Sequence, residues 1–512
     1  MLETLGGEDP VTSIPVQSQT LSLSLDPLNP LLSTYHFVGI GGVGMSALAY
    51  ILAKQGFRVS GSDIAANGRT RRLEALGVRF VQGHTSEGLI GDPQVIYSSA
   101  IHPGNPELAA ALGKGLPIWH RADLLAALFN HRPSIGVAGT HGKTTTSSMI
   151  GYVLLAAGWD PTLIIGGEVD AWEGNARLGQ GKYLVAEVDE SDGSLVRLHP
   201  QVGVITNIEL DHPDHYADLD QVIRAFQQYA AQSQTLVACL DCPNLVAHLA
   251  VDVGYSIEGH PQALYQARQI VYAGDSTHAE IWEGGSRLGY LRLQVLGSHN
   301  LGNALAAIAV GRQLGLEFAV IAAALSQFQG AHRRFERKGE VGGVTFVDDY
   351  AHHPSEIQAT LRAARLQQRR VVAVFQPHRH SRLARLFPDF ARCFEDADVV
   401  LIVPTYGAGE PTPVRSDSLR LAVAVSEHHP HVRHVFSLQQ LPEVLRSVLQ
   451  PGDLVTFLGA GDLNQQIAAT MRAYAVEAEQ RPSMDPEDPE MDSAGPTEDS
   501  TREKGASEVL AS

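Results

Sequence analysis

The stretch Ser134-Ile135-Gly136-Val137-Ala138, followed by Gly139-Thr140-His141-Gly142-Lys143-Thr144-Thr145, decides the fold. It predicts an apolar strand, a Gly-rich turn and then a helix, whose apolar face continues at Met149, Ile150, Val153 and Leu154. Backbone N–H groups and the positive end of the helix dipole favour an anion at such a turn. We therefore expect residues 139–145 to bind ATP, with Lys143 at the β- and γ-phosphates and Thr144 as a Mg²⁺ ligand.

This phosphate loop departs from the usual pattern at one position. The pattern G-x-x-x-x-G-K-[ST] places Gly at 137, whereas this chain has Val137 and carries glycines at 136 and 139. We interpret the loop as a shortened relative of the usual one. A structural Gly-rich turn with a surface lysine is the alternative.

A second glycine loop comes earlier in the chain. An apolar strand at 35–38 leads into Gly39-Ile40-Gly41-Gly42-Val43-Gly44, a helix follows, and the next strand ends at Asp63. The pattern G-x-G-x-x-G with an acid about twenty residues later predicts a pyrophosphate-binding turn in a doubly wound domain. A further strand of that domain carries Ser98 and Ser99. Taken alone, this loop suggests an NAD site, but the pattern does not distinguish one nucleotide from another. A glycine turn with a purely structural role is the alternative.

Acidic clusters end two buried strands of the central region. The first is Glu187-Val188-Asp189-Glu190-Ser191-Asp192, and the second runs from Thr206 to His212. Because ligands lie beyond the carboxyl ends of strands in open α/β sheets, both clusters should face the phosphate loop. A carboxylate and a histidine there could hold Mg²⁺ beside the γ-phosphate, and simple helix capping is the alternative.

Polar side chains later in the chain could reach the same site. Asn303, at the start of a helix, can cap it or contact a base edge. The pair Arg333-Arg334 could neutralise charge on a transferring phosphoryl group, although a solvated surface pair is the commoner case. Two His-rich segments, 348–354 and 375–382, follow; we favour recognition of a substrate carboxylate by Arg379 or Arg382 over metal binding there.

Composition narrows the class of protein. The 512 residues carry a formal charge of −18, which argues against nucleic acid as a partner. Residues 481–512 hold nine acidic and three basic residues and predict a disordered tail. The three cysteines, a leader without Lys or Arg, and the lack of a long apolar stretch predict a cytoplasmic protein without membrane insertion.

Seven motifs in one order resemble the Mur ligase family: 39–46, 139–145, 187–192, 206–212, 297–303, 348–354 and 375–382. The resemblance implies an α/β fold of three domains, which we place at 34–132 (Rossmann-like, UDP-sugar-binding), 133–335 (P-loop ATPase with a mainly parallel sheet) and 336–478 (Rossmann-like, amino-acid-binding). A flexible leader at 1–33 and a disordered acidic tail at 479–512 flank them.

The resemblance also implies roles for single residues. Lys143, His212 and Arg334 are expected to be catalytic, and Thr144, Glu187 and His212 to hold Mg²⁺. Asn303, Arg334 and Asp349 join residues 139–145 in binding ATP. The UDP substrate is expected at Gly39, Gly41, Gly42, Val43, Gly44, Asp63, Ser98 and Ser99. The amino acid is expected at Tyr350, His352, His353, His378 and Arg379.

The implied reaction activates the carboxylate of UDP-N-acetylmuramate as an acyl phosphate, which an amino acid then attacks. Several relatives use a carbamylated lysine as a metal ligand, but no lysine lies between Lys182 and Lys338. This favours the L-alanine-adding branch, or the tripeptide-recycling branch, and the first glycine loop favours alanine. We expect a monomer or weak homodimer. An NAD-dependent oxidoreductase and an inactive nucleotide-binding module are the alternatives.

Overall fold

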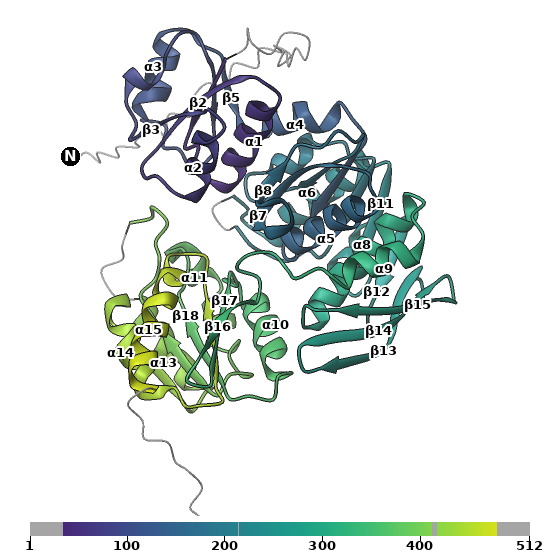
Figure 1. The fold of residues 1–512 in the computed structure, drawn as a ribbon, viewed down its shortest axis with the longest axis vertical. Coiled ribbons are helices and arrows are strands. Elements are labelled where there is room, and N and C mark those ends of the chain that lie inside the picture. Colours follow the sequence, from purple (N-terminus) through teal and green to yellow (C-terminus); the bar gives the residue numbers. More distant parts are fainter. Residues whose placement is uncertain (1–33, 213–214, 412–416, 479–512) are drawn as a thin grey trace, which may run out of the picture.

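A computed structural model describes residues 34–212, 215–411 and 417–478, which form three lobes, each built on its own sheet (Figure 1). The expectations for 1–33 and for 479–512 lie outside these residues. Among the residues described, no helix is long and apolar enough to span a membrane.

The N-terminal lobe contains a five-stranded parallel sheet in the order β3-β2-β1-β4-β5. This is the strand order of a Rossmann-like domain. The first three strands are added toward one edge of the sheet, and the order reverses at β4, which lies on the other side of β1. The strands are β1 (Thr34–Val38), β2 (Arg58–Asp63), β3 (Arg79–Gln82), β4 (Gln94–Tyr97) and β5 (Ile118–His120). The helices are α1 (Val43–Lys54), α2 (Gly68–Glu74), α3 (Pro106–Gly113) and α4 (Arg121–Asn130), with a 3₁₀ turn η1 (Ser86–Gly88).

The central lobe contains ten strands in the order β15-β14-β13-β12-β11-β10-β6-β9-β7-β8. Its strands are β6 (Ser134–Ala138), β7 (Thr162–Val169), β8 (Gly174–Arg177), β9 (Leu184–Glu187), β10 (Val202–Ile205), β11 (Thr235–Cys239), β12 (Val253–Ser256), β13 (Tyr265–Ala273), β14 (Ser276–Glu283) and β15 (Ser286–Leu293). Its helices are α5 (Lys143–Ala156), α6 (Leu219–Gln232), α7 (Pro243–His248), α8 (Ser298–Gln313) and α9 (Phe318–Leu325), with 3₁₀ turns η2 (Asp170–Trp172) and η3 (Ser194–Arg197).

The C-terminal lobe has six strands in the order β16-β17-β21-β18-β19-β20. They are β16 (Glu336–Val341), β17 (Val344–Asp349), β18 (Val371–Phe375), β19 (Val399–Ile402), β20 (Val432–His434) and β21 (Leu454–Leu458). The helices are α10 (Pro354–Arg365), α11 (His380–Arg385), α12 (Phe387–Phe390), α13 (Asp417–Ser426), α14 (Leu441–Val448) and α15 (Ile467–Ala478), with 3₁₀ turns η4 (Leu438–Gln440) and η5 (Leu463–Gln466).

The predicted fold class is confirmed, and antiparallel pairing of β7 with β8, in the meander β13-β14-β15 and in the hairpin β16-β17 extends it. β6, β9, β10, β18, β19 and β21 are parallel and almost wholly buried, as the near-continuous apolar runs indicated. The meander β13-β14-β15 and the hairpin β16-β17 were not predicted. The strands β13, β15 and β16 are half-exposed and mix polar and apolar residues, so they lack that signal, whereas β14 is mostly and β17 wholly buried.

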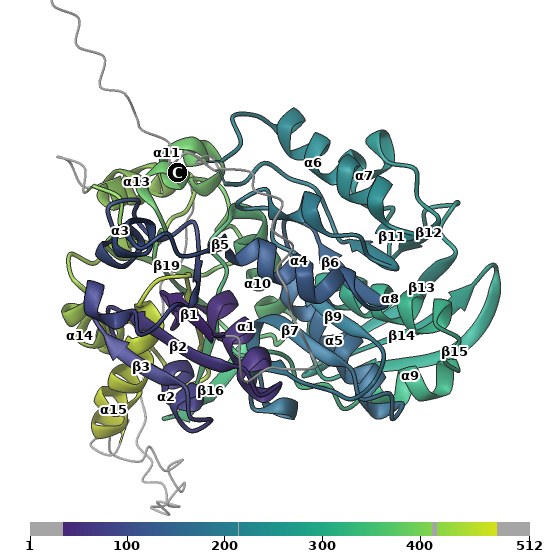
Figure 2. The same cartoon turned by 90° about the horizontal axis from the view of Figure 1, so that it is seen from above.

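The three lobes meet around the central helix α5 and the strand ends beside it. Figure 1 shows the N-terminal and C-terminal lobes on the same side of the central lobe, and Figure 2 shows α1 next to the central strands. The helix α1 packs on β7 and β8, and α10 packs on α8. The N-terminal and C-terminal lobes therefore both pack against the central lobe.

Candidate active site

The phosphate loop joins β6 to α5 and is held by the loop that follows β10. The amide of Thr140 donates to the carbonyl oxygen of Asn207 at 3.1 Å, and the amide of His141 donates to Asn207 Oδ1 at 2.8 Å. At Gly139 the backbone has φ +131°, and a Cβ atom would lie 2.0 Å from Thr206 Oγ1. Val137 instead sits inside β6, paired with Glu187 and Val204. Gly139 is thus the position that requires glycine, which accounts for the shortened pattern.

Lys143 lies over this loop and pairs with an acid from the first cluster. Its Nζ donates to the carbonyl oxygens of Gly139 and Thr140 at 2.6 and 3.0 Å and to Glu190 Oε2 at 2.9 Å. Burial alone would lower the pKa of Lys143, but Glu190, Asp189 and Glu187 outweigh it and raise the pKa above its usual value. Lys143 is therefore a fixed cation at the start of α5.

Thr144 and Glu187 form the oxygen pair that the sequence predicted as Mg²⁺ ligands. Thr144 Oγ1 donates to Glu187 Oε2 at 2.8 Å, and the Gly166 amide donates to the same oxygen at 2.8 Å. Burial raises the pKa of Glu187, against the opposing effects of Lys143 and the Thr144 hydroxyl. Neighbouring ligands of octahedral Mg²⁺ lie about 2.9 Å apart, because the bonds are about 2.0–2.1 Å long and meet at right angles. This oxygen pair fits the ion.

His212 lies among the acids of the two clusters. Its Nε2 is 3.5 Å from Glu190 Oε1 and 3.6 Å from Asp211 Oδ2. Asp189, Glu190 and His212 have ligand atoms close enough to hold one cation. Burial alone would raise the pKa of Asp189, but Lys143, Arg121 and His212 lower it to about 2. The structure thus adds Asp189 and Glu190 to the predicted cation-binding acids.

Arg334 reaches the phosphate loop from the segment between the central and C-terminal lobes. Its Nη2 is 3.4 Å from Thr144 Oγ1, and its guanidinium lies 5.2 Å from the ring centre of Tyr350. Asp349 fixes this segment, because its carboxylate accepts from the amides of Phe335 and Ala351 at 2.7 Å each. Burial raises the pKa of Asp349 to about 6, although Arg334 opposes the shift.

Asn303 lies on α8 directly behind the phosphate loop. Its Oδ1 accepts from Thr146 Oγ1 at 3.0 Å, and its Nδ2 is 3.3 Å from Asn300 Oδ1. A Cβ atom on Gly142 would come within 2.6 Å of Asn303 Oδ1. In this arrangement Asn303 supports the loop, and its predicted contact with adenine stays a prediction.

The first glycine loop joins β1 to α1 and is tied down through its backbone. The amides of Gly39 and Ile40 donate to the carbonyl oxygen of Ser62 at 2.8 and 2.9 Å, and the Gly41 amide donates to Asp63 Oδ2 at 2.8 Å. Asp63 therefore shapes the loop. Ser98 and Ser99 follow β4, which pairs with β1, so they lie at the same edge of the sheet.

The central lobe contacts this loop from behind. Asn175 Nδ2 donates to the carbonyl oxygen of Val43 at 2.6 Å and to Ser46 Oγ at 3.1 Å. Arg69 Nε donates to the Gly41 carbonyl at 2.8 Å while its Nη1 pairs with Glu168 at 3.2 Å. The loop is thus positioned by two lobes.

A buried acid lies behind the first glycine loop. Glu107 accepts a short hydrogen bond from Ser62 Oγ, and its Oε2 is 3.4 Å from His84 Nδ1 and 3.6 Å from His36 Nε2. Burial alone would raise the pKa of Glu107, but the hydrogen bonds from His36 and Ser62 lower it below its usual value. The carboxylate thereby holds Ser62 near the end of β2, next to Asp63, the last residue of that strand.

The predicted amino-acid residues divide into two groups. His352 and His378 lie together, with ring centres 5.8 Å apart, and Tyr350 packs on His352 at 5.3 Å. Burial lowers the pKa of His352 to about 3 and that of His378 to about 4, so both rings are neutral at physiological pH. Arg379 N–H donates to the Tyr406 carbonyl beside them.

His353 faces the other way, toward the phosphate loop. Its ring centre is 4.7 Å from that of His141, and burial lowers its pKa. Of the five residues predicted for the amino acid, His353 is the one that the structure places apart from the pair of His352 and His378.

Comparison with known proteins identifies the family. Models for the Mur ligase family match in three consecutive segments: the catalytic domain at residues 34–133, the middle domain at 137–311 and the glutamate ligase domain at 333–461. Together these segments cover most of the chain. It belongs to the Mur ligase family.

Individual Mur ligases are similar over almost the full length. UDP-N-acetylmuramate–L-alanine ligase of Synechococcus sp. (strain JA-3-3Ab) is 79% identical over 513 residues, covering 100% of both chains. The protein of that name from Thermosynechococcus vestitus is 55% identical, over 85% of this chain and 95% of that one. The crystal structure of UDP-N-acetylmuramate–alanine ligase from Thermotoga maritima superimposes with a TM-score of 0.75 at 30% identity, covering 87% of this chain and 99% of that one.

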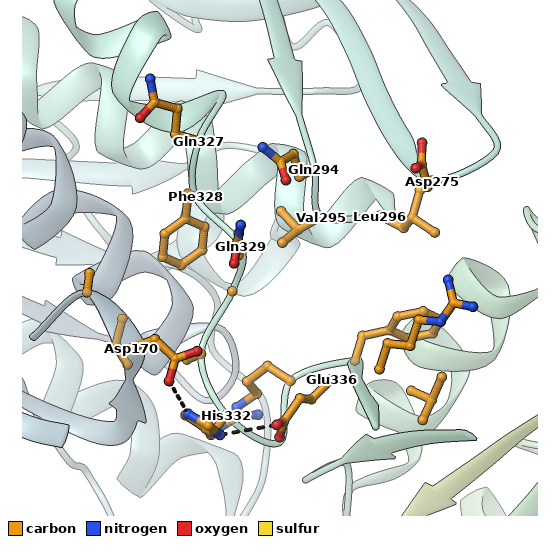
Figure 3. A pocket seen from close by; sticks show the side chains of 18 of the residues that line it. Asp170, Asp275, Gln294, Val295, Leu296, Gln327, Phe328, Gln329, His332 and Glu336 are labelled. Carbon is orange, nitrogen blue, oxygen red and sulfur yellow. Dashed lines mark hydrogen bonds and ion pairs between the residues drawn. The ribbon is translucent and has the colours of Figure 1, made fainter. Parts of the chain in front are cut away.

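A cavity of about 850 Å³ lies beside the hinge between the central and C-terminal lobes of this Mur ligase (Figure 3). Asp170, Val295 and Phe328 line it from the central lobe and Glu336 from the C-terminal lobe, with His332 bridging Asp170 and Glu336. Among its described lining residues, Arg334 is the one predicted for the ATP site. The cavity therefore adjoins that site without containing the phosphate loop.

Sequence reasoning missed the side chains that join the lobes. Arg121, at the start of α4, pairs with Asp192 at 2.8 Å and with Asp189 at 3.4 Å. Arg382 forms a buried two-pronged pair with Asp211, at 2.8 and 3.2 Å. Asp192 and Asp211 lie in recognised motifs, and Arg382 was considered only for a substrate carboxylate. Arg121 and Asn175 lie outside the seven motifs that resemble the Mur ligase family, so no signal in the sequence pointed to them.

Proposed function

We propose that this Mur ligase uses ATP to join L-alanine to the carboxylate of UDP-N-acetylmuramate in the synthesis of peptidoglycan precursors. The observation that carries the proposal is the position of the Thr144 hydroxyl, which contacts both Glu187 and Arg334 next to the Lys143–Glu190 pair, where three lobes meet. The 79% identity to the Synechococcus enzyme along the whole chain supports this choice of substrates.

The reaction proceeds in two transfers. The substrate carboxylate attacks the γ-phosphorus of ATP, ADP leaves, and an acyl phosphate forms; the amine of L-alanine then attacks the acyl carbon, releases phosphate and loses a proton. Lys143 and Arg334 bring two cations to the oxygens of the transferring phosphoryl group. Residues 139–145, with Asn303 and Asp349 behind and beside them, are assigned to ATP.

Magnesium would be held by Thr144, Glu187 and His212. When bound, the ion neutralises phosphate charge and orients the γ-phosphoryl group. The Thr144–Glu187 oxygen pair supports this assignment, and Asp189 and Glu190 add carboxylates beside His212.

We assign residues 34–132 to the UDP-sugar, 133–335 to ATP and 336–478 to the amino acid. The backbone of Gly39, Gly41, Gly42, Val43 and Gly44 would receive the pyrophosphate, with Asp63, Ser98 and Ser99 at the same sheet edge. Tyr350, His352, His378 and Arg379 form the amino-acid group, to which His353 contributes from the side of the phosphate loop. We further propose that the protein is cytoplasmic and is a monomer or a weak homodimer.

Phosphate release tests the proposal. The full chain is incubated with ATP, Mg²⁺ and UDP-N-acetylmuramate, and single amino acids are added in turn. L-Alanine should stimulate release more than glycine, L-serine or a tripeptide does. Equal stimulation by a tripeptide would instead assign the chain to the recycling branch.

A further inference from the structure

Three potential metal ligands meet between the central and C-terminal lobes, away from Glu187 and His212. They are His141 of the phosphate loop, Glu209 after β10 and His353 at the start of α10, and their ligand atoms all lie within 4.8 Å of one another. We propose that these three residues form a second metal site, for a transition-metal ion of the zinc class, which joins the phosphate loop to the C-terminal lobe.

The distances are close to those of a tetrahedral site. His141 Nε2 lies 3.5 Å from Glu209 Oε2, and His353 Nδ1 lies 3.8 Å from the same oxygen. Ligand atoms around tetrahedral zinc are about 3.3 Å apart, because the bonds to nitrogen and oxygen are about 2.0–2.1 Å long. The two distances to Glu209 Oε2 exceed this value by a few tenths of an ångström, and the two imidazole nitrogens lie within 4.8 Å of each other, so inward movement of the rings would bring the three atoms around one ion.

A carboxylate outside the site orients His141 as a ligand. His141 Nδ1 is 3.1 Å from Glu356 Oε1, so in the metal-bound form the N–H on Nδ1 would donate to Glu356 and Nε2, on the side of Glu209, would ligate the ion. That Nε2 is buried and has no hydrogen-bond partner among residues 34–212, 215–411 and 417–478. A histidine that donates its second N–H to a carboxylate is the usual arrangement at metal sites.

The other two ligands also present acceptor atoms. His353 Nδ1 lies 3.8 Å from Glu209 Oε2, and its single lone pair accepts only a long hydrogen bond from the Ser355 amide, at 3.3 Å, which a bound ion would replace. Glu209 is held by Ser355 Oγ at 2.6 Å. His353 is 5% exposed, so an ion here would be largely shielded from water.

The ligand types separate this site from the magnesium site. Two imidazoles and one carboxylate suit zinc-class ions, whereas the oxygen-rich set around Glu187, Asp189 and Glu190 suits Mg²⁺. The competing occupant is a proton, which would make His141 an imidazolium between Glu209 and Glu356. The experiment has to separate these two occupants.

Cobalt(II) is the probe, because tetrahedral Co²⁺ absorbs visible light with an intensity that octahedral Co²⁺ lacks. The full chain, treated with chelator and free of Mg²⁺ and nucleotide, is titrated with Co²⁺ and then with Zn²⁺. We expect intense visible bands that reach their maximum at one equivalent of Co²⁺. Added Zn²⁺ should displace the Co²⁺ and remove the bands.

Three ligand variants and one support variant test the residues. His141→Asn, Glu209→Gln and His353→Asn should each weaken Co²⁺ binding by more than 100-fold, and Glu356→Gln by roughly 10–100-fold. Asn at 353 keeps an acceptor for the start of α10, so the helix is preserved. His212→Asn and His278→Asn are the controls and should keep the bands. Circular dichroism checks that every variant is folded.

Two outcomes overturn the proposal. Absence of tetrahedral bands in the parent chain would mean that a proton on His141, and not a metal ion, occupies the site. Bands that survive His353→Asn but vanish with His212→Asn would place the ion at the magnesium site. Neither outcome bears on phosphate release with L-alanine, so the proposed function is tested separately.

Discussion

The two glycine loops occupy the same place in their lobes and differ in what surrounds them. Each follows the first strand of a parallel sheet and begins a helix, at the edge where the strands end. The loop at Gly39 is held by backbone amides and Asp63, with Asn175 behind it. The loop at Gly139 carries Lys143 and faces Glu187, Glu190 and Arg334.

This difference shows that a glycine loop by itself supplies only a place for a pyrophosphate. Chemistry requires the cations and carboxylates that converge on the second loop. Substitutions in the second loop should therefore lower kcat, and substitutions in the first should raise KM for the UDP-sugar.

Lys143→Ala should give the largest effect. Loss of a fixed cation at the transferring phosphoryl group should lower kcat by about 100- to 1000-fold, as for other lost electrostatic donors. Binding of UDP-N-acetylmuramate, measured by calorimetry, should not change. Lys182→Ala is the control, since Lys182 is an exposed lysine of the same lobe that packs on Tyr183. A variant at 143 with normal kcat would contradict the assignment of the phosphate loop.

Gly41→Ala should raise KM for UDP-N-acetylmuramate by roughly tenfold, equivalent to about 1.4 kcal/mol. A Cβ atom there would lie 2.9 Å from Asp63 Oδ2 and 2.7 Å from Asn67 Nδ2, so the loop must shift. KM for ATP and kcat should stay near normal in steady-state assays. Gly68→Ala is the control, because no described heavy atom lies within 4 Å of the added carbon. An equal rise in KM for ATP and in KM for UDP-N-acetylmuramate would show that the two loops are not functionally separate.

Glu107→Gln should alter how the stability of the N-terminal lobe depends on pH. The folded-state pKa of Glu107 is lowered, so its contribution is present above the unfolded pKa, near 4.3, and is lost as pH falls through the folded value. We expect a loss of about 1–3 kcal/mol at neutral pH, when the charged acceptor is removed from beside His36 and His84. The gap in melting temperature from the parent should narrow as the pH falls below about 4. A gap that stays constant would contradict a charged Glu107.

Glu168→Gln should have the smallest effect. Its pair with Arg69 joins the central lobe to the first loop, but the two side chains are 42% and 29% exposed. Exposed pairs contribute about 0.2–1 kcal/mol and are screened by salt. KM for the UDP-sugar should rise less than fivefold at low salt and return to the parent value at high salt. A large effect that salt does not remove would mean that Glu168 acts by another route.

The sheet edge at which the motif residues lie could be predicted from the sequence, because these residues directly follow strands. Once β6, β9 and β10 are recognised from their apolar runs, Lys143, Glu187 and the second acidic cluster must lie at one sheet edge. The fold class and the family followed from the same strand and motif order. The assignment of individual residues to substrates remains a prediction.

Contacts between lobes could not be predicted in the same way. Asn175 meets Val43 across 132 positions of the chain, and His141 meets Glu356 across 215. Such pairs depend on how three separate sheets pack, which no local pattern encodes. The opposite directions of His352 and His353 are a further example, because each is fixed by a partner from a distant segment.

The contact of Asn175 with Val43 and Ser46 is a direct physical link between the two glycine-loop lobes. It connects β8 of the central lobe to the first turn of α1, directly after the loop at Gly39. If one ligand changes the affinity for the other through this contact, the reverse effect must have the same magnitude. Asn175→Ala would then lower the coupling free energy measured from either side by the same amount, whichever ligand is bound first.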